Sequence, residues 1–134
     1  MDNTLLNKSE TLSKCLKRIE DEYREHEHDF TVNFTVQDAI MLNLERAIQA
    51  CIDAGAHIIR KQNLGIPQAN REVFQMLFEH GYISNELSLS LQQMVGFRNI
   101  LVHDYKRINL DIVVTIIKEK VADIDKFRHV LLSV

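Results

Sequence analysis

Residues 36–62 carry the sequence VQDAIMLNLERAIQACIDAGAHIIRKQ, which decides the fold class. Apolar side chains recur along it at the three- and four-residue spacing of one helix face. They are Ile40, Leu44, Ala47, Ile48, Cys51, Ile52, Ala54, Gly55, Ile58 and Ile59. At ~1.5 Å per residue, such a helix spans most of a small domain. The stretch therefore predicts one long helix with a wide apolar face.

Helix breakers are scarce in the whole chain of 134 residues. The only proline and the four glycines are Pro67, Gly55, Gly65, Gly81 and Gly96. A β-sandwich or barrel of this size needs a turn signal every ~8–12 residues, which this chain does not supply. We therefore predict an all-α fold, in which residues 1–134 form a single antiparallel helical bundle of about five helices.

The remaining helices are placed by apolar periodicity and by capping residues. Besides the long helix, we expect helices over about 4–28 and 71–80, one that carries Leu87 to Leu101, and one that follows Asn109. The candidate caps are Asn33 or Thr35, Gly81, Ser84 or Asn85, and Asn109. A turn is expected around His103–Ile108, and the last helix is expected to bury Ile112.

Composition narrows the classes of function. The sequence has no apolar run of ~20 residues and no charged-then-apolar leader, which predicts a cytoplasmic protein without a membrane span. Cys15 and Cys51 lie in helical apolar patterns without C-x-x-C spacing, so we expect two reduced, buried thiols rather than a zinc or redox site. The net charge of -3 means that any contact with nucleic acid must be made through a local site.

The end of the first predicted helix is strongly acidic between Glu20 and Asp29. We expect a solvated face there, with docking of a basic partner as its functional candidate. His26 and His28 lie within it, but residues two apart on a helix do not face together, so a metal site is disfavoured. His57 falls within the apolar run of the long helix and is expected to be a core or edge histidine.

The stretch that carries chemistry is GFRNILVHDY, residues 96–105. Arg98 and His103 are five residues apart, which places them ~140° apart around a straight helix. They can act together if the helix frays near Val102, so that His103 turns back towards Arg98. They can also act together if a second copy of the chain completes the site.

Arginine and histidine suit the cleavage of RNA. Imidazole exchanges protons near neutral pH, and guanidinium offers donors to phosphate oxygens. RNA supplies its own nucleophile, the 2′-hydroxyl, so proton transfer and a cation on the developing phosphorane suffice without a metal. Lys106 and Arg107 would attract phosphate if exposed. The structural alternative is that Arg98 and His103 only complement the dipole at a helix C-terminus.

Residues 98–105, RNILVHDY, resemble the R-x4-H-x-Y signature of the HepT family within the HEPN superfamily of small helical ribonucleases. The preceding Gly96-Phe97 and the tyrosine two residues after the histidine strengthen the match. The likeness covers most of the chain, from residues 43–59 through the Gly81 turn to the C-terminal helix.

This resemblance implies a function for each residue of the motif. Arg98 and His103 would be the catalytic pair of a metal-independent endoribonuclease toxin that needs no cofactor, and Asn99 would help to orient the site. Tyr105 would receive AMP from ATP, transferred by an MNT-type minimal nucleotidyltransferase antitoxin. A homodimer would bring two motifs into one cleft.

Two other functions remain open at this point. The bundle could be a non-catalytic binding subunit that presents substrate or nucleotide to a nucleotidyltransferase. It could also be a structural dimer with a fortuitous motif. Arg98 together with His103 favours the enzyme, because a binding module needs no histidine beside an arginine.

Overall fold

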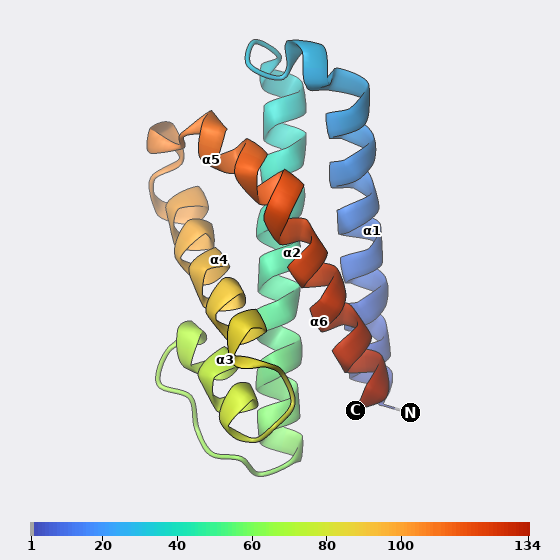
Figure 1. Cartoon of the computed structure of the whole chain (residues 1–134), viewed down its shortest axis with the longest axis vertical. Coiled ribbons are helices and arrows are strands. Elements are labelled where there is room, and N and C mark those ends of the chain that lie inside the picture. The colour runs from blue at the N-terminus through green and yellow to red at the C-terminus, as the bar shows by residue number, and fades with distance from the viewer. Residues whose placement is uncertain (1) are drawn as a thin grey trace.

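The computed structural model describes residues 2–134, and these residues form helices joined by turns and loops (Figure 1). The α-helices are α1 (Asn3–His26), α2 (Phe34–Lys61), α3 (Asn70–Glu79), α4 (Asn85–His103), α5 (Leu110–Thr115) and α6 (Val121–Ser133). The short elements are the 3₁₀ turns η1 (Glu27–Asp29) and η2 (Tyr105–Arg107) and the π-helical turn η3 (Ile116–Lys120). The elements α5, η3 and α6 follow one another without a break and together form one helical segment. Residues 2–134 therefore form a bundle of five long helical segments. The predicted all-α helical bundle is confirmed.

The long helix α2 is the central element of the bundle. It contacts α1, α3, α4 and α6, and it runs antiparallel to α1 along the length of the molecule (Figure 1). Its apolar face is buried, as the spacing predicts. The largest fully buried side chains come from several elements and are Leu5, Leu12, Ile19, Phe30, Ile40, Leu44, Ile58, Ile59, Phe74, Leu77, Met94 and Phe127. The two termini lie side by side at one end, and the junction between α4 and α5 lies towards the other (Figure 1).

Side-chain caps fix where three helices begin. Asn33, Ser84 and Asn109 each accept a hydrogen bond from a backbone N–H in the first turn of α2, α4 and α5. The structure therefore selects Asn33 over Thr35 and Ser84 over Asn85. Each of the selected residues has an extended backbone that leads into the helix, which is the conformation of an N-cap.

Glycine is required at two positions. Gly81 has a φ of 81° just after α3, where a side chain would be strained, so it acts as the predicted C-cap. At Gly55 a Cβ atom would lie 2.6 Å from Cγ1 of Val73, because α2 and α3 approach closely there. The absence of a side chain at Gly55 allows this close packing.

The last predicted helix is interrupted by the π turn η3. Buried Ile116 and Ile124 are eight residues apart, which in a regular α-helix would place them ~80° apart. The extra residue of a π turn brings them onto one face, so that both reach the core. Ile112 does not follow the predicted stripe: its side chain is 51% exposed. The prediction that Ile112 is buried is wrong.

Composition predicts two buried thiols and no membrane-spanning helix. Cys15 and Cys51 are both free and buried, and burial raises the pKa of each thiol. This confirms the predicted buried thiols. None of the helices within residues 2–134 is long and apolar enough to cross a membrane.

Candidate functional site

The motif residues lie at the C-terminal end of α4 and in η2, away from the two chain termini (Figure 1). Helix α4 continues through His103, and the chain leaves helical geometry only at Asp104, which has a φ of -148°. Arg98 and His103 therefore project ~140° apart from one chain. The alternative in which the helix frays near Val102 is wrong. Completion of the site by a second copy is the alternative that remains.

Arg98 is half-buried, and its Nε atom is buried without a hydrogen-bond partner within residues 2–134. A buried, unpaired donor on a charged group destabilises the folded chain. Such groups are rare in native proteins and need an explanation, of which a functional role is one. Arg98 is thus partly buried in the bundle, but its Nε makes no hydrogen bond there.

His103 and Asn99 are both exposed at the surface of α4. Neither side chain takes part in a hydrogen bond or ion pair within the described part of the chain. His103 does lie in the last turn of α4, where a cation complements the helix dipole. Both side chains are free to contact a ligand.

Tyr105 is the first residue of η2 and is 45% exposed. Its hydroxyl donates a hydrogen bond to Oδ1 of Asp38, which lies in the second turn of α2. Burial of the ring, together with the Asp38 carboxylate, raises the pKa of Tyr105 to about 12. The motif in the sequence did not indicate Asp38. Because the two residues are 67 positions apart, no local spacing points to their contact.

A groove of about 420 Å³ runs beside the motif, between α4 and the start of α5. It is lined by Arg71, Gln93, Gly96, Phe97, Ile100, Arg107, Ile108, Asn109 and Ile112. Most of the lining is apolar, and one of its two arginines, Arg107, lies 3.3 Å from a carboxylate oxygen of Asp104. Arg71 is therefore the cation of the groove that is best able to attract an anion. The guanidinium of Arg71 lies directly over Gly96, where a side chain would collide with it. The sequence pattern did not indicate Arg71, because it lies in α3.

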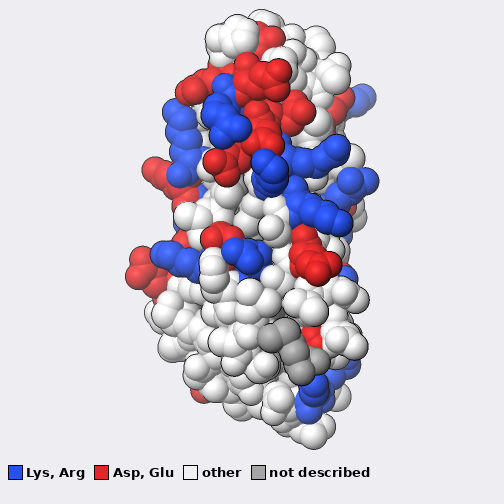
Figure 2. Space-filling model, turned by 90° about the vertical axis from the view of Figure 1, so that its right-hand side faces the viewer, with Lys and Arg blue, Asp and Glu red and all other residues white. Residues whose placement is uncertain are grey.

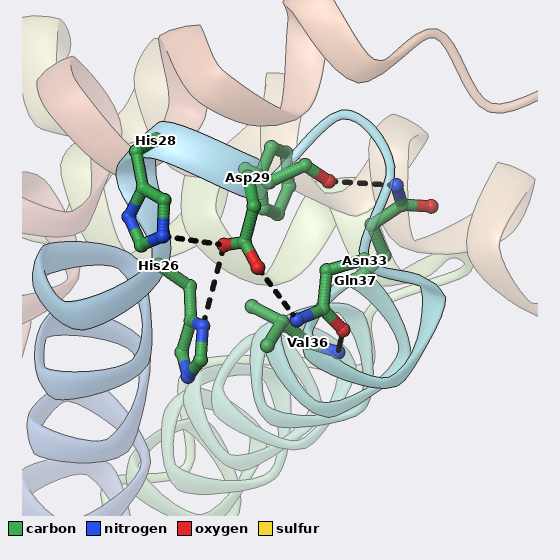
Figure 3. A network of polar contacts seen from close by, with 7 residues as sticks. His26, His28, Asp29, Asn33, Val36 and Gln37 are labelled. Carbon is green, nitrogen blue, oxygen red and sulfur yellow. Dashed lines mark hydrogen bonds and ion pairs between the residues drawn. The ribbon is translucent and has the colours of Figure 1, made fainter.

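The histidines of the acidic segment belong to a structural network (Figure 3). His26 Nδ1 and His28 Nε2 lie 3.3 and 3.8 Å from Oδ1 of Asp29. Oδ2 of Asp29 accepts a hydrogen bond from Asn33, the cap of α2, which holds the pKa of the Asp29 carboxyl below its usual range. No group of three potential ligands for a metal occurs within residues 2–134. The network fixes the turn between α1 and α2.

The surface at the acidic end of α1 carries both negative and positive side chains. Acidic and basic side chains are mixed over the upper part of the face that includes α1, as Figure 2 shows. Asp21 is 3.2 Å from Lys17 and 2.8 Å from Arg24, and Lys118 is 3.9 Å from Glu27. Because the basic residues of the chain itself neutralise the acidic ones, this face gives little support to docking of a basic partner.

His57 lies near the opposite end of the bundle from the motif. Its Nε2 is 2.8 Å from Oδ2 of Asp2, and Nζ of Lys61 is 2.7 Å from the same oxygen. Asp2 also accepts a hydrogen bond from the backbone N–H of Leu5, which caps α1. These bonds hold the pKa of Asp2 well below its usual range, Lys61 having the largest effect. His57 is therefore the expected edge histidine with a structural role.

The chain is similar to known proteins over nearly its whole length. The model of the ribonuclease HepT-like family matches residues 12–131. The mRNA nuclease HepT of Shewanella oneidensis is 44% identical over 131 residues, which are 98% of this chain and 98% of that protein. The match therefore spans the motif and nearly all of both chains.

Solved structures agree with this assignment. The tri-AMPylated HEPN toxin of Shewanella oneidensis, in complex with an MNT antitoxin, matches with a TM-score of 0.94 at 42% identity over 100% of both chains. A toxin–antitoxin complex with a tyrosine-to-alanine mutation matches with a TM-score of 0.93 at 42% identity, over 98% of this chain and 100% of that chain. The chain therefore belongs to the ribonuclease HepT-like family and is an endoribonuclease.

Proposed function

We propose that this endoribonuclease is the toxin of a type II toxin–antitoxin pair, and that Arg98 and His103 cleave RNA without a metal. The observation that carries the proposal is the state of these two side chains. Arg98 is half-buried with an unpaired Nε, and His103 is exposed without a partner within residues 2–134. Both stand in the R-x4-H-x-Y pattern that resembles the HepT signature, within the part of the chain that the family model matches.

The chemistry follows from the groups present. The 2′-hydroxyl of RNA attacks the neighbouring phosphorus, and the bond to the 5′-oxygen of the next nucleotide breaks. His103 transfers protons to and from these oxygens, and Arg98 stabilises the negative charge of the phosphorane. Asn99, exposed beside Arg98, orients the scissile phosphate. The groove next to the motif, whose lining includes Arg71, supports local binding of RNA by a chain with a net charge of -3.

We further propose that residues 1–134 act as one HEPN-like domain and form a homodimer. The proton that leaves the 2′-hydroxyl and the proton that reaches the 5′-oxygen move most readily when a base and an acid are present at the same time, and α4 is helical through His103, so one chain does not bring Arg98 and His103 to the same face. Two copies supply two histidines. Ile100 and Ile112, 44% and 51% exposed beside the groove, support a contact between copies near the motif.

The antitoxin of the pair is an MNT-type nucleotidyltransferase that transfers AMP from ATP to Tyr105. The Shewanella oneidensis HEPN toxin is tri-AMPylated in its complex with an MNT antitoxin, which supports this assignment. Tyr105 is 45% exposed and lies two residues after His103. A phosphodiester at this position would add bulk and negative charge next to the cleft and would compete with substrate phosphate for Arg98.

Replacement of the tyrosine tests this function. The Tyr105→Phe variant should retain RNA cleavage and toxicity to growing cells, but it should no longer be silenced by the antitoxin with ATP. Mass spectrometry of the wild-type chain after the same incubation should place adenylate on Tyr105. Tyr82→Phe is the matched control, because Tyr82 is half-buried in the turn after α3. Silencing of Tyr105→Phe as complete as that of the wild type, or an adduct on another residue, would refute the switch.

A further inference from the structure

The hydrogen bond between Tyr105 and Asp38 joins the modified residue of the proposed function to a carboxylate from another helix. The phenolic hydroxyl is the donor, so the lone pairs of its oxygen are not used by this contact. Tyr105 is 45% exposed, and Asp38 is exposed as well. The oxygen can therefore be approached by a reagent while the carboxylate holds its proton.

The phenol keeps its proton at neutral pH. Burial and the neighbouring carboxylate raise the pKa of Tyr105 to about 12. At pH 7 a group with this pKa is ionised in only ~10⁻⁵ of the molecules. A reaction at this oxygen therefore begins from the protonated form, and the proton must leave during the step that makes the new bond.

Other side chains of η2 and its flanks are poorly placed to take this proton. Lys106 and Arg107 are cations and have no acceptor to offer. Asp104 lies 3.3 Å from Nε of Arg107 and is paired with it. His103 makes no hydrogen bond to Tyr105 within the described residues. A general base must be within hydrogen-bond reach of the proton, and Asp38 meets this condition.

We propose that Asp38 is the proton acceptor for transfer of an adenylate group to Tyr105, an inference that rests on Tyr105 being the site of modification. The phenolic oxygen bonds to the α-phosphorus of ATP, and the bond from that phosphorus to the bridging oxygen breaks, releasing pyrophosphate. The proton passes to Oδ1 of Asp38, which returns it to water. The toxin thus contributes a catalytic group to its own silencing.

The same contact favours departure of the modified side chain from α2. Once esterified, the Tyr105 oxygen has no proton to donate, and its phosphodiester is an anion next to the Asp38 carboxylate. The negative phosphodiester and the negative carboxylate repel each other. The modified ring is then displaced from Asp38.

The experiment measures the initial rate of adenylate incorporation at Tyr105, by mass spectrometry, in the full-length chain with saturating ATP and MNT antitoxin. Asp38→Ala and Asp38→Asn should each slow incorporation by about 10²-fold or more, the range for loss of a general base. RNA cleavage by the unmodified variants should stay at the wild-type level. Glu45→Ala, which removes another carboxylate of α2, is the matched control and should incorporate adenylate at the wild-type rate.

The pH profile separates proton transfer from positioning. Without Asp38 the proton must go to hydroxide, so the ratio of the Asp38→Asn rate to the wild-type rate should rise by up to about tenfold per pH unit between pH 7 and 9. A wild-type rate in Asp38→Asn, or a ratio that does not change with pH, would overturn the inference. If the wild-type chain itself gains no adenylate on Tyr105, the proposed function fails first. If the wild-type chain is modified and Asp38→Ala is modified equally fast, only the role of Asp38 fails.

Discussion

The two ends of the bundle each contain a histidine near a basic residue, but they differ in how these groups are paired. At the end with the chain termini, His57 and Lys61 both bond to one carboxylate oxygen of Asp2. At the motif end, His103 and the buried Nε of Arg98 have no partner within residues 2–134. Residue types alone would not distinguish these sites.

The two ends also differ in what their charged side chains do within the chain. Asp2 caps α1 and joins it to α2, so the charges near it are used to hold helices together. At the motif end, His103 makes no hydrogen bond or ion pair within residues 2–134, and Arg98 carries an unpaired buried donor. Side chains kept in an unfavourable state are typical of functional sites.

The largest effect is expected for loss of the motif's cation. Arg98→Ala should lower the rate of RNA cleavage by about 10²–10³-fold, because one preorganised charge on the transition state contributes that much. Lys61→Ala, which removes a cation from the paired end, should cleave RNA at the wild-type rate. Cleavage of a labelled RNA is the measurement, and circular dichroism checks the fold. Equal activity of both variants would remove the proposed distinction between the two ends.

A smaller but still large effect is expected from a charge placed on the apolar surface beside the motif. Ile112→Asp should convert the dimer to a monomer and suppress RNA cleavage, since an unpaired charge would be buried between the copies. Light scattering at the assay concentration measures the assembly. Ile66→Asp is the control, because Ile66 is 80% exposed in the loop between α2 and α3. A monomeric Ile112→Asp chain that cleaves RNA normally would contradict the dimeric site.

The smallest effect is expected at the paired end. The pKa of Asp2 is lower in the folded chain than its usual value, so its ionised form adds stability above about pH 4, and this contribution is lost as the pH falls towards the folded pKa. Asp2→Asn should therefore lower Tm by about a few degrees at pH 7, and the difference from the wild type should shrink by pH 3. RNA cleavage at pH 7 should not change. A difference in Tm that is constant from pH 7 to pH 3 would show that the charge of Asp2 is not responsible.

Local patterns in the sequence were enough for the fold. The apolar spacing of residues 36–62 matches the buried face of α2, and Asn33, Ser84 and Asn109 cap helices as expected. These features depend on neighbours within one or two turns, which the sequence places directly. The position of the motif at the end of α4 follows in the same way.

Features that depend on distant residues were not predictable in this way. Asp38 meets Tyr105 only because the fold brings the start of α2 near η2, and Arg71 covers Gly96 only because α3 lies beside α4. The π turn η3 also depends on tertiary packing, because it re-phases the helix so that Ile124 reaches the core. Asp38 and Arg71 thereby add a carboxylate and a guanidinium to the surroundings of the motif.

In the proposed mechanism the unpaired histidine, His103, carries out the chemistry, and the paired one, His57, does not. Its most direct test compares RNA cleavage by His103→Ala and His57→Ala in EDTA, with both variants shown to be folded. We expect His103→Ala to lose cleavage by about 10²-fold or more, while His57→Ala should cleave as the wild type does. Wild-type cleavage by a folded His103→Ala chain would show that His103 is not the catalytic histidine.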